Sequence, residues 1–153
     1  KAIEIIIKDD FPKLAREIHE KLNPALEELK KKYPNKIDDV RGAGSLNGIM
    51  LKTPFKKLEK IVSKIPLRFI QDKKSFLNKL TTVSIMDYLY REHSILTSVT
   101  PDDKNILLSV MPSVIAKRKQ IDYFIQCLDI ALGKGLSSHV VAFVSRNLKN
   151  VLS

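Results

Sequence analysis

Three glycines within seven residues constrain this chain more than any other feature of its sequence. Residues 39–51 read DVRGAGSLNGIML, which places Gly42, Gly44 and Gly48 just before and inside an apolar run that otherwise has the composition of a β-strand. Glycine weakens a strand, because it loses more backbone freedom than other residues and has no side chain to pack. A turn or the close approach of another group must therefore account for these glycines.

Long stretches of the remaining sequence have the apolar spacing of amphipathic α-helices. The clearest is residues 11–33, which follows an N-cap at Asp9 or Asp10. Its apolar positions are Leu14, Ile18, Leu22, Leu26 and Leu29. Proline removes a backbone hydrogen bond and collides with the preceding turn, so we expect a kink or a break at Pro24. Further helices are predicted over residues 55–65, 82–93, 121–132 and 138–152, and the 121–132 helix should end at Gly133.

Strand patterns lie between these helices. Residues 37–40 lead into a first strand, residues 46–51 form a strand with apolar side chains on both faces, and residues 95–100 and 105–111 form a hairpin around a turn at residues 101–104. This order of elements predicts an α+β fold with a small antiparallel sheet and helices packed mainly on one face. Residues 67–80 mix apolar and polar side chains without a clear period.

Three of these segments, in this order, resemble class III aminotransferases of the acetylornithine and ornithine aminotransferase group, which use pyridoxal phosphate (PLP). Residues 39–51 resemble the family segment VRGxG-LxxGIxL. The run NILLSVMP at residues 105–112 resembles NVIRFxPPL, and residues 121–132 resemble the closing helix EIDELLDALxEAL. The resemblance implies the C-terminal small domain of a fold-type I transferase over residues 1–136, with residues 67–80 as an insertion and residues 137–153 as an additional helix packed on it.

In such a protein this domain would cap the substrate, while the whole enzyme transfers an amino group from an amine donor to a keto or aldehyde acceptor. The resemblance places the Schiff-base lysine and the phosphate-binding loops in a large domain that is absent here. A first residue, Lys1, that is not methionine agrees with a piece of a longer protein. We therefore expect no catalytic and no cofactor-binding residue in this chain, PLP only in the parent protein, and the parent's large domain and a homodimer partner as its partners.

The resemblance also indicates six positions near the substrate or within the structural motif: Arg41, Gly42, Gly44, Gly48, Leu108 and Pro112. In the family, the arginine of NVIRFxPPL contacts the substrate carboxylate, because a guanidinium can hold a carboxylate through two hydrogen bonds. This chain has Leu108 there, and Met111 replaces the first of the two prolines. Either the parent acts on a different amine donor or its activity has been lost. A non-catalytic interaction module that retains the fold is the alternative function. Arg41 has an alternative role too, an ion pair with Asp38 or Asp39.

The net charge of +10 raises the question of nucleic acid binding. Lys and Arg against Asp and Glu number 15 and 10 over residues 1–64 and 12 and 7 over residues 65–153, so each part carries +5. The excess is spread along the chain, and no nucleic-acid-binding motif accompanies the lysines of residues 52–64. We do not expect nucleic acid as a partner.

Other candidate sites are weak. His19, His93 and His139 are dispersed and lack partners at the spacing of zinc ligands, so no metal site is expected. Cys127 lies in a helical pattern and should pack as a small apolar residue. No apolar run approaches the ~20 residues that span a bilayer, which makes a cytoplasmic protein the expectation.

Overall fold

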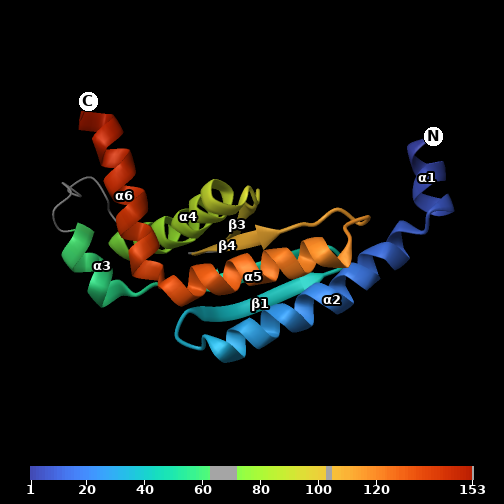
Figure 1. The fold of residues 1–153 in the computed structure, drawn as a ribbon, viewed down its shortest axis with the longest axis horizontal. Coiled ribbons are helices and arrows are strands. Elements are labelled where there is room, and N and C mark those ends of the chain that lie inside the picture. Colours follow the sequence, from blue (N-terminus) through green and yellow to red (C-terminus); the bar gives the residue numbers. More distant parts are fainter. Residues whose placement is uncertain (63–71, 103–104, 153) are drawn as a thin grey trace.

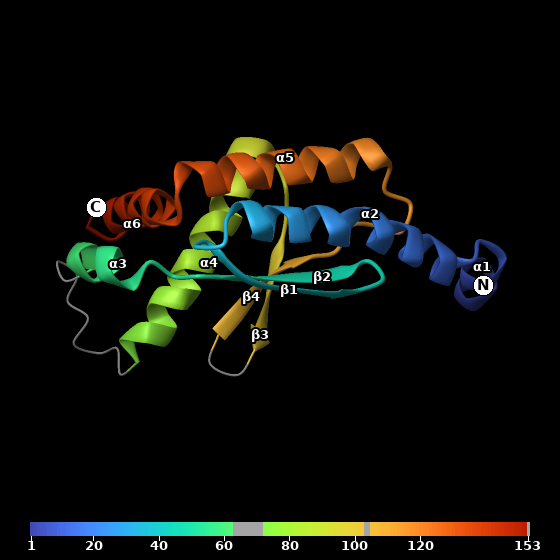
Figure 2. The ribbon, with the colours of Figure 1, turned by 90° about the horizontal axis from the view of Figure 1, so that it is seen from below.

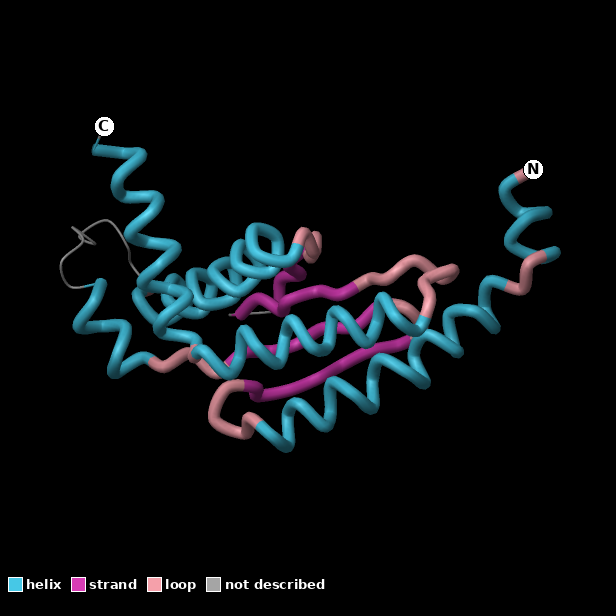
Figure 3. Tube along the Cα trace, viewed as in Figure 1, coloured by secondary structure: helices cyan, strands magenta, loops and turns pink. Residues whose placement is uncertain are grey.

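The computed structural model describes residues 1–62, 72–102 and 105–152. These residues form an α+β fold of helices and strands (Figures 1 and 3). The sheet is four-stranded and antiparallel, in the order β1-β2-β4-β3, which confirms the predicted fold class. The elements are α1 Ala2–Lys8, α2 Phe11–Lys32, β1 Ile37–Ala43, β2 Leu46–Leu51, α3 Phe55–Val62, α4 Lys73–His93, β3 Ser98–Asp102, β4 Asn105–Val110, α5 Arg118–Lys134 and α6 Leu136–Leu152.

The first hairpin explains two of the glycines. Gly42 pairs with Asn47 and Ala43 with Leu46, so Gly44 and Ser45 form the turn between β1 and β2. Gly44 has φ +57°, a conformation that residues with a side chain rarely adopt. A Cβ atom on Gly42 would lie 2.2 Å from Asn47 Oδ1, because the Asn47 amide lies over this position. The glycines thus serve a tight turn and a close side-chain approach, as their positions predict.

Helix α2 begins where the sequence predicts. The Asp10 carboxylate accepts a hydrogen bond from the backbone N–H of Lys13 (3.3 Å), as an N-cap does. The helix then continues through Pro24 to Lys32, so the expected break is wrong. Buried side chains lie on both sides of the proline, and their packing against the sheet offsets the lost hydrogen bond. These residues are Ile18, Leu22, Leu26 and Leu29.

The second hairpin has its second strand, β4, beginning at residue 105 as predicted, whereas its first strand, β3, is shifted toward the C-terminus. Strand β3 begins at Ser98, because Ser94 ends α4 in a left-handed conformation (φ 55°) and the next residues form a loop. Pairing continues through Pro101, opposite Ile106, to Asp102, opposite Asn105. Proline is tolerated here because β3 is an edge strand. The predicted turn residues 103–104 lie outside the described residues.

Helices cover one face of the sheet and bury the main core. Helix α2 packs on β1, α4 packs on β4, and α5 contacts both helices (Figure 2). Side chains that point toward these helices from the two central strands include Ile49 and Leu108, both fully buried. At roughly 25 cal/mol per Å² of buried apolar surface, this single layer of contacts is the main source of stability.

Helix α4 is longer than its apolar pattern predicts. It begins at Lys73, where Asp72 accepts a hydrogen bond from the Ser75 N–H (3.0 Å), and not at residue 82. Residues 73–80 of the expected insertion are therefore its first turns, and residues 67–71 lie outside the described residues. Its buried face is partly polar: the Thr81 hydroxyl donates to the Leu77 carbonyl (2.8 Å) and Ser84 donates to Thr81 (2.8 Å). Hydroxyls bonded back to their own helix can be buried at little cost.

The chain turns sharply between the last two helices. Helix α5 continues past Gly133 to Lys134, and Gly135 (φ 93°) ends it, which corrects the predicted end. Helix α6 follows at 88° to α5 and lies against α4 and α3 (Figure 1). A second small apolar cluster forms there from Leu58, Leu77 and Val140. In the described part of the chain, no single helix is long and apolar enough to cross a bilayer, and only the bent α5–α6 pair reaches that length and composition together.

Candidate functional site

The face of the sheet turned away from the main core carries a shallow hollow of about 170 Å³. It is lined by the first hairpin and by residues from β3 and β4 that point to the same side. Arg41, Gly42 and Gly48 belong to it, and Leu46 and Leu107 supply much of its apolar surface. The structure therefore brings together three of the six positions that the sequence indicated.

Two hydroxyl groups add polar character to this hollow. Thr100 Oγ1 on β3 and Ser109 Oγ on β4 lie 2.5 Å apart and share a hydrogen bond. Each hydroxyl retains free lone pairs, so the pair can accept a hydrogen bond from a small polar group placed against the sheet. This pair was not predicted, because only the antiparallel register of β3 and β4 places the two residues diagonally across the strand pair.

Arg41 is held at the edge of the hollow by an acidic neighbour. Its Nε donates to Asp39 Oδ2 (2.8 Å), and Lys30 Nζ of α2 donates to Asp39 Oδ1 (3.0 Å). The hydrogen bond from Arg41, followed by the one from Lys30, lowers the pKa of Asp39 below the usual carboxyl value. The ion pair between Arg41 and Asp39 is one of the two alternatives that the sequence left open for this arginine.

The other three predicted positions lie elsewhere. Gly44 is in the hairpin turn, with Ala15 of α2 as its close neighbour. Leu108 is fully buried on the opposite face of β4, within the main core. Pro112 lines a small apolar pocket of about 120 Å³ beside Leu22 and Phe124. The six positions therefore do not converge on one site.

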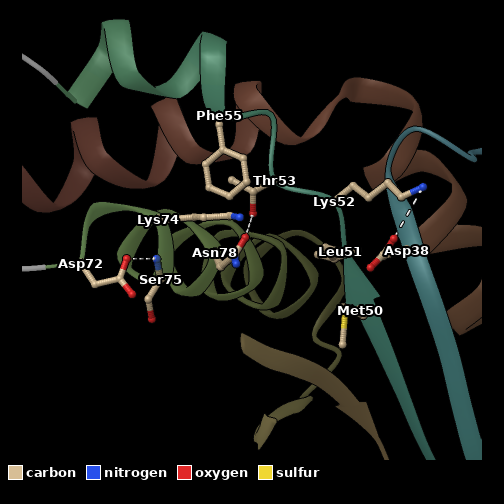
Figure 4. Close-up of a pocket in the computed structure, with 10 residues that line it drawn as sticks. All are labelled: Asp38, Met50, Leu51, Lys52, Thr53, Phe55, Asp72, Lys74, Ser75 and Asn78. Atoms are coloured by element: carbon tan, nitrogen blue, oxygen red, sulfur yellow. Dashed lines mark hydrogen bonds and ion pairs between the residues drawn. The ribbon is translucent and has the colours of Figure 1, made fainter. Parts of the chain in front are cut away.

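A larger pocket of about 510 Å³ lies where the first hairpin, α3 and α4 meet (Figure 4). The sequence gave no indication of it, because its walls come from segments separated by the 63–71 connection. The starts of α3 and α4 face each other across it, and Asp38 and Lys52 stand at the sheet side. Its lining residues are Asp38, Met50, Leu51, Lys52, Thr53, Phe55, Asp72, Lys74, Ser75 and Asn78.

Most polar groups of this pocket already have protein partners. Lys52 Nζ donates to the Pro34 carbonyl (2.8 Å) and lies 3.6 Å from Asp38 Oδ1. The Thr53 hydroxyl donates to Asn78 Oδ1, which joins the start of α3 to α4. Lys74 Nζ lies 5.7 Å from the centre of the Phe55 ring (Figure 4). The two aspartates and two lysines that line the pocket balance in charge, and hydrogen bonds between protein groups hold its walls together.

These residues do not fit PLP. A Schiff-base lysine reacts through its neutral amine, which requires desolvation or a neighbouring cation to lower its pKa. Lys52 and Lys74 are both exposed to solvent, and the near neighbour of Lys52 Nζ is a carboxylate oxygen, Asp38 Oδ1, at 3.6 Å, and not a cation. A phosphate at the start of α4 would meet the carboxylate of Asp72, which already caps that helix.

Histidines that are distant in the sequence come together at another place. His93 at the end of α4 and His139 on α6 both contact the ring of Tyr88, with centroid distances of 5.3 Å and 4.4 Å. Within the described residues, no three His, Cys, Asp or Glu side chains are grouped as metal ligands. Cys127 is buried in the main core, as its helical pattern predicts.

The fold resembles part of several solved transaminases. A transaminase from the marine bacterium Virgibacillus matches with a TM-score of 0.64 and 18% identity over 89% of this chain and 27% of its own. Ornithine delta-aminotransferase of Plasmodium falciparum matches with a TM-score of 0.56 and 16% identity over the same shares. An aminotransferase of Bacillus anthracis matches with a TM-score of 0.56 and 19% identity over 86% and 26%.

This chain spans about a quarter of the length of those proteins. No protein-family model and no curated protein matches it. At such low identity the similarity establishes the fold, which is that of one part of an aminotransferase chain.

Proposed function

Because this chain has the fold of part of an aminotransferase, we propose that it is the C-terminal, substrate-capping domain of a PLP-dependent class III aminotransferase-like protein. The whole protein would transfer an amino group from an amine donor to a keto or aldehyde acceptor. The isolated chain is inert in this proposal, and its partners are its own large domain and a second copy of the full-length protein. The observation that carries the proposal is the match of nearly the whole chain to one part of the transaminases.

The cofactor belongs to the large domain in this proposal. The 510 Å³ pocket fails as a PLP site because its lysines are exposed and its helix start carries an aspartate. The chain's own contribution is a surface: the open sheet face with Arg41, Thr100 and Ser109 would cover the reacting groups and exclude water from them. Excluding water strengthens every polar interaction made in such a site.

The core position of Leu108 bears on the choice of substrate. No guanidinium can reach the open face from this position, since the side chain at 108 points into the apolar core. A buried carboxylate partner lost in this way costs about 2–5 kcal/mol of binding. We infer that the parent protein acts on an amine donor whose carboxylate, if it has one, is held by a group outside strand β4.

Two measurements test the proposal. The 153-residue chain is incubated with PLP, reduced with borohydride and examined by mass spectrometry, and no stoichiometric lysine adduct is expected. The full-length protein is treated in the same way, and there one adduct should form on a lysine upstream of Lys1. An adduct on the short chain would contradict the assignment of the cofactor to another domain.

The alternative is a non-catalytic interaction module that keeps this fold, and the absence of a guanidinium at residue 108 favours it. The same experiment separates the two functions. A full-length protein that binds no PLP and shows no amine-dependent change in cofactor absorbance would support the module, whereas a protein that turns over an amine donor would exclude it.

A further inference from the structure

The joint between α5 and α6 is a single residue, which does little by itself to fix the orientation of α6 relative to α5. Gly135 (φ 93°) is the one residue between Lys134 and Leu136, and a side chain built on it would meet no atom within 4 Å. The two helix axes are nevertheless set at 88°. The direction of α6 must therefore be fixed by what its side chains contact after the bend.

The central contact is made by His139, on the first turn of α6. Its side chain is 6% exposed, and its Nε2 lies 2.8 Å from the Ala131 carbonyl oxygen of α5. Because a carbonyl can only accept, Nε2 carries a proton, and the other ring nitrogen is unprotonated in the neutral imidazole. The ring also packs on Tyr88 of α4, with a centroid distance of 4.4 Å. Through these two contacts, His139 connects α6 to α5 and to α4.

The groups that face His139 do not suit a positive charge. From α4 it faces the Tyr88 phenol, which accepts a hydrogen bond from Lys134 Nζ (3.0 Å) and lies 3.3 Å from His93 Nε2. From α5 it faces the Lys134 ammonium, whose pKa is raised by that hydrogen bond and, less, by Glu92, so that it stays charged.

Among the described residues, no nearby carboxylate is free to neutralise a positive charge on His139, and α3 presents no charged side chain to it. On α4, the Asp87 carboxylate is engaged by Arg91 (2.7 Å) and by Arg146 of α6. From α3, Leu58 shares an apolar cluster with Val140, and the charged side chains described on that helix are exposed: Lys56, Lys57 and Glu59. A protonated His139 would therefore be a buried cation beside another cation.

We propose that His139 makes the α5–α6 joint a proton-operated latch, in which neutral His139 holds α6 against α4 and protonation releases α6 about Gly135. Release breaks the contacts to Ala131 and Tyr88 and uncovers the apolar cluster that α6 shares with α3 and α4. The sheet and its main core stay intact, because Leu136 is all that the described side chains of α6 contribute to that core.

The direction of the effect follows from linkage. Burial lowers the pKa of His139, the bond to Ala131 raises it, and Lys134 lowers it further, with a net decrease. A depressed pKa in the docked state means that docking is strongest above the ordinary imidazole pKa of about 6.5 and weakens as the pH falls below it. For one proton taken up on release, the open fraction rises by up to about tenfold per pH unit.

Nuclear magnetic resonance of the 153-residue chain tests this proposal. Amide protection factors are measured between neutral and mildly acidic pH for α6 and for β2 and β4, together with the titration of the His139 imidazole. The expected result is a loss of protection confined to α6, with a midpoint that matches the His139 titration and lies below the ordinary histidine value. Loss of protection in α6 and the sheet together, or a midpoint at or above the ordinary value, would overturn the proposal.

Two variants make the test specific. His139→Gln keeps a side-chain N–H for the Ala131 carbonyl but cannot be protonated, so α6 should stay docked and lose its pH dependence. His93→Gln is the matched control, because it removes the other histidine on Tyr88 and should leave the transition in place. A transition that survives in His139→Gln, or disappears only in His93→Gln, would contradict the latch. If His139→Gln does not fold, agreement between the α6 and His139 midpoints in the unmodified chain decides the question.

Discussion

The glycines of this chain differ in whether the structure leaves room for a side chain. Gly42 is required by the Asn47 amide that lies over it, whereas Gly133 sits inside α5 with ordinary space around it. The sequence indicated that three glycines must have a structural cause. The structure gives a different cause for two of them: the Asn47 side chain lies close to Gly42, and Gly44 has the left-handed conformation of a turn.

Replacing Gly42 and replacing Gly133 with alanine should have opposite effects on stability. Gly42→Ala is expected to destabilise the fold by about 1–3 kcal/mol, because the new Cβ overlaps Asn47 Oδ1 and one of them must move. Gly133→Ala is expected to stabilise it by about 0.5–1 kcal/mol through helix propensity. Urea denaturation measures both, and a stable Gly42→Ala variant would show that the Asn47 amide can be displaced freely.

Residue 108 gives a second prediction at this scale. Leu108→Arg, which introduces the arginine of the segment that residues 105–112 resemble, should lose about 3–5 kcal/mol because it buries an unpaired charge in the core. Leu107→Arg, one residue earlier and on the open face, should cost far less. Thermal unfolding of the two variants compares them. A greater loss for Leu107→Arg would mean that β4 presents its faces the other way round, and equal losses would mean that the two positions do not differ in burial.

At the scale of helices and strands, an ion pair joins α2 to β1. Asp39 on β1 accepts hydrogen bonds from Arg41 of its own strand and from Lys30 of α2, and both lower its pKa, the one from Arg41 more. A depressed carboxyl pKa contributes stability above the unfolded value of about 3.9, and that stability is lost as the pH falls through the folded value.

Asp39→Asn should therefore weaken the fold near neutral pH and have little effect in acid. The loss should stay below about 1 kcal/mol, because these side chains are partly exposed and screened. Asp38→Asn is the control, since the ion pair of Asp38 with Lys52 is longer, at 3.6 Å. Denaturation at several pH values gives the two profiles, and a constant difference across the pH range would exclude a contribution from this carboxylate.

The elements also show what the sequence could predict. Helices with an apolar stripe, such as α2 and α5, were predicted well, because burial imposes their period. The start of α4 was missed because residues 73–80 show no clear apolar period and because Thr81, whose hydroxyl bonds back to Leu77, takes the place of an apolar side chain on its buried face.

The candidate site was predicted only in part, because it depends on register and on connections. The resemblance indicated Arg41, Gly42 and Gly48, but only the pairing of β1 with β2 shows that they line one hollow. Leu108 and Pro112 could not be assigned to a face until the pairing of β2 with β4 was known. The Figure 4 pocket joins segments that no local pattern connects.

At the scale of the whole molecule, two apolar clusters of unequal size divide the structure. The main core holds the sheet and three helices, whereas Leu58, Leu77 and Val140 join α3, α4 and α6 in a small cluster of their own. Few buried contacts hold the smaller cluster, so it should open more readily than the rest.

Val140→Ala should show this difference. The change removes buried apolar surface worth about 2 kcal/mol and should lower the protection of α6 amides while those of β2 and β4 keep their values. Native-state hydrogen exchange at neutral pH reports both regions, and equal losses in each would mean that the molecule unfolds as one unit.

The strand order β1-β2-β4-β3 has a consequence for synthesis. The first hairpin leaves the ribosome well before β4 is made, and until then the free edge of β2 presents unpaired N–H and C=O groups beside an apolar face. Another nascent chain can pair with that edge in the meantime. The interval before β4 arrives is therefore when this polypeptide is most prone to aggregate, and it is when a chaperone would protect it most.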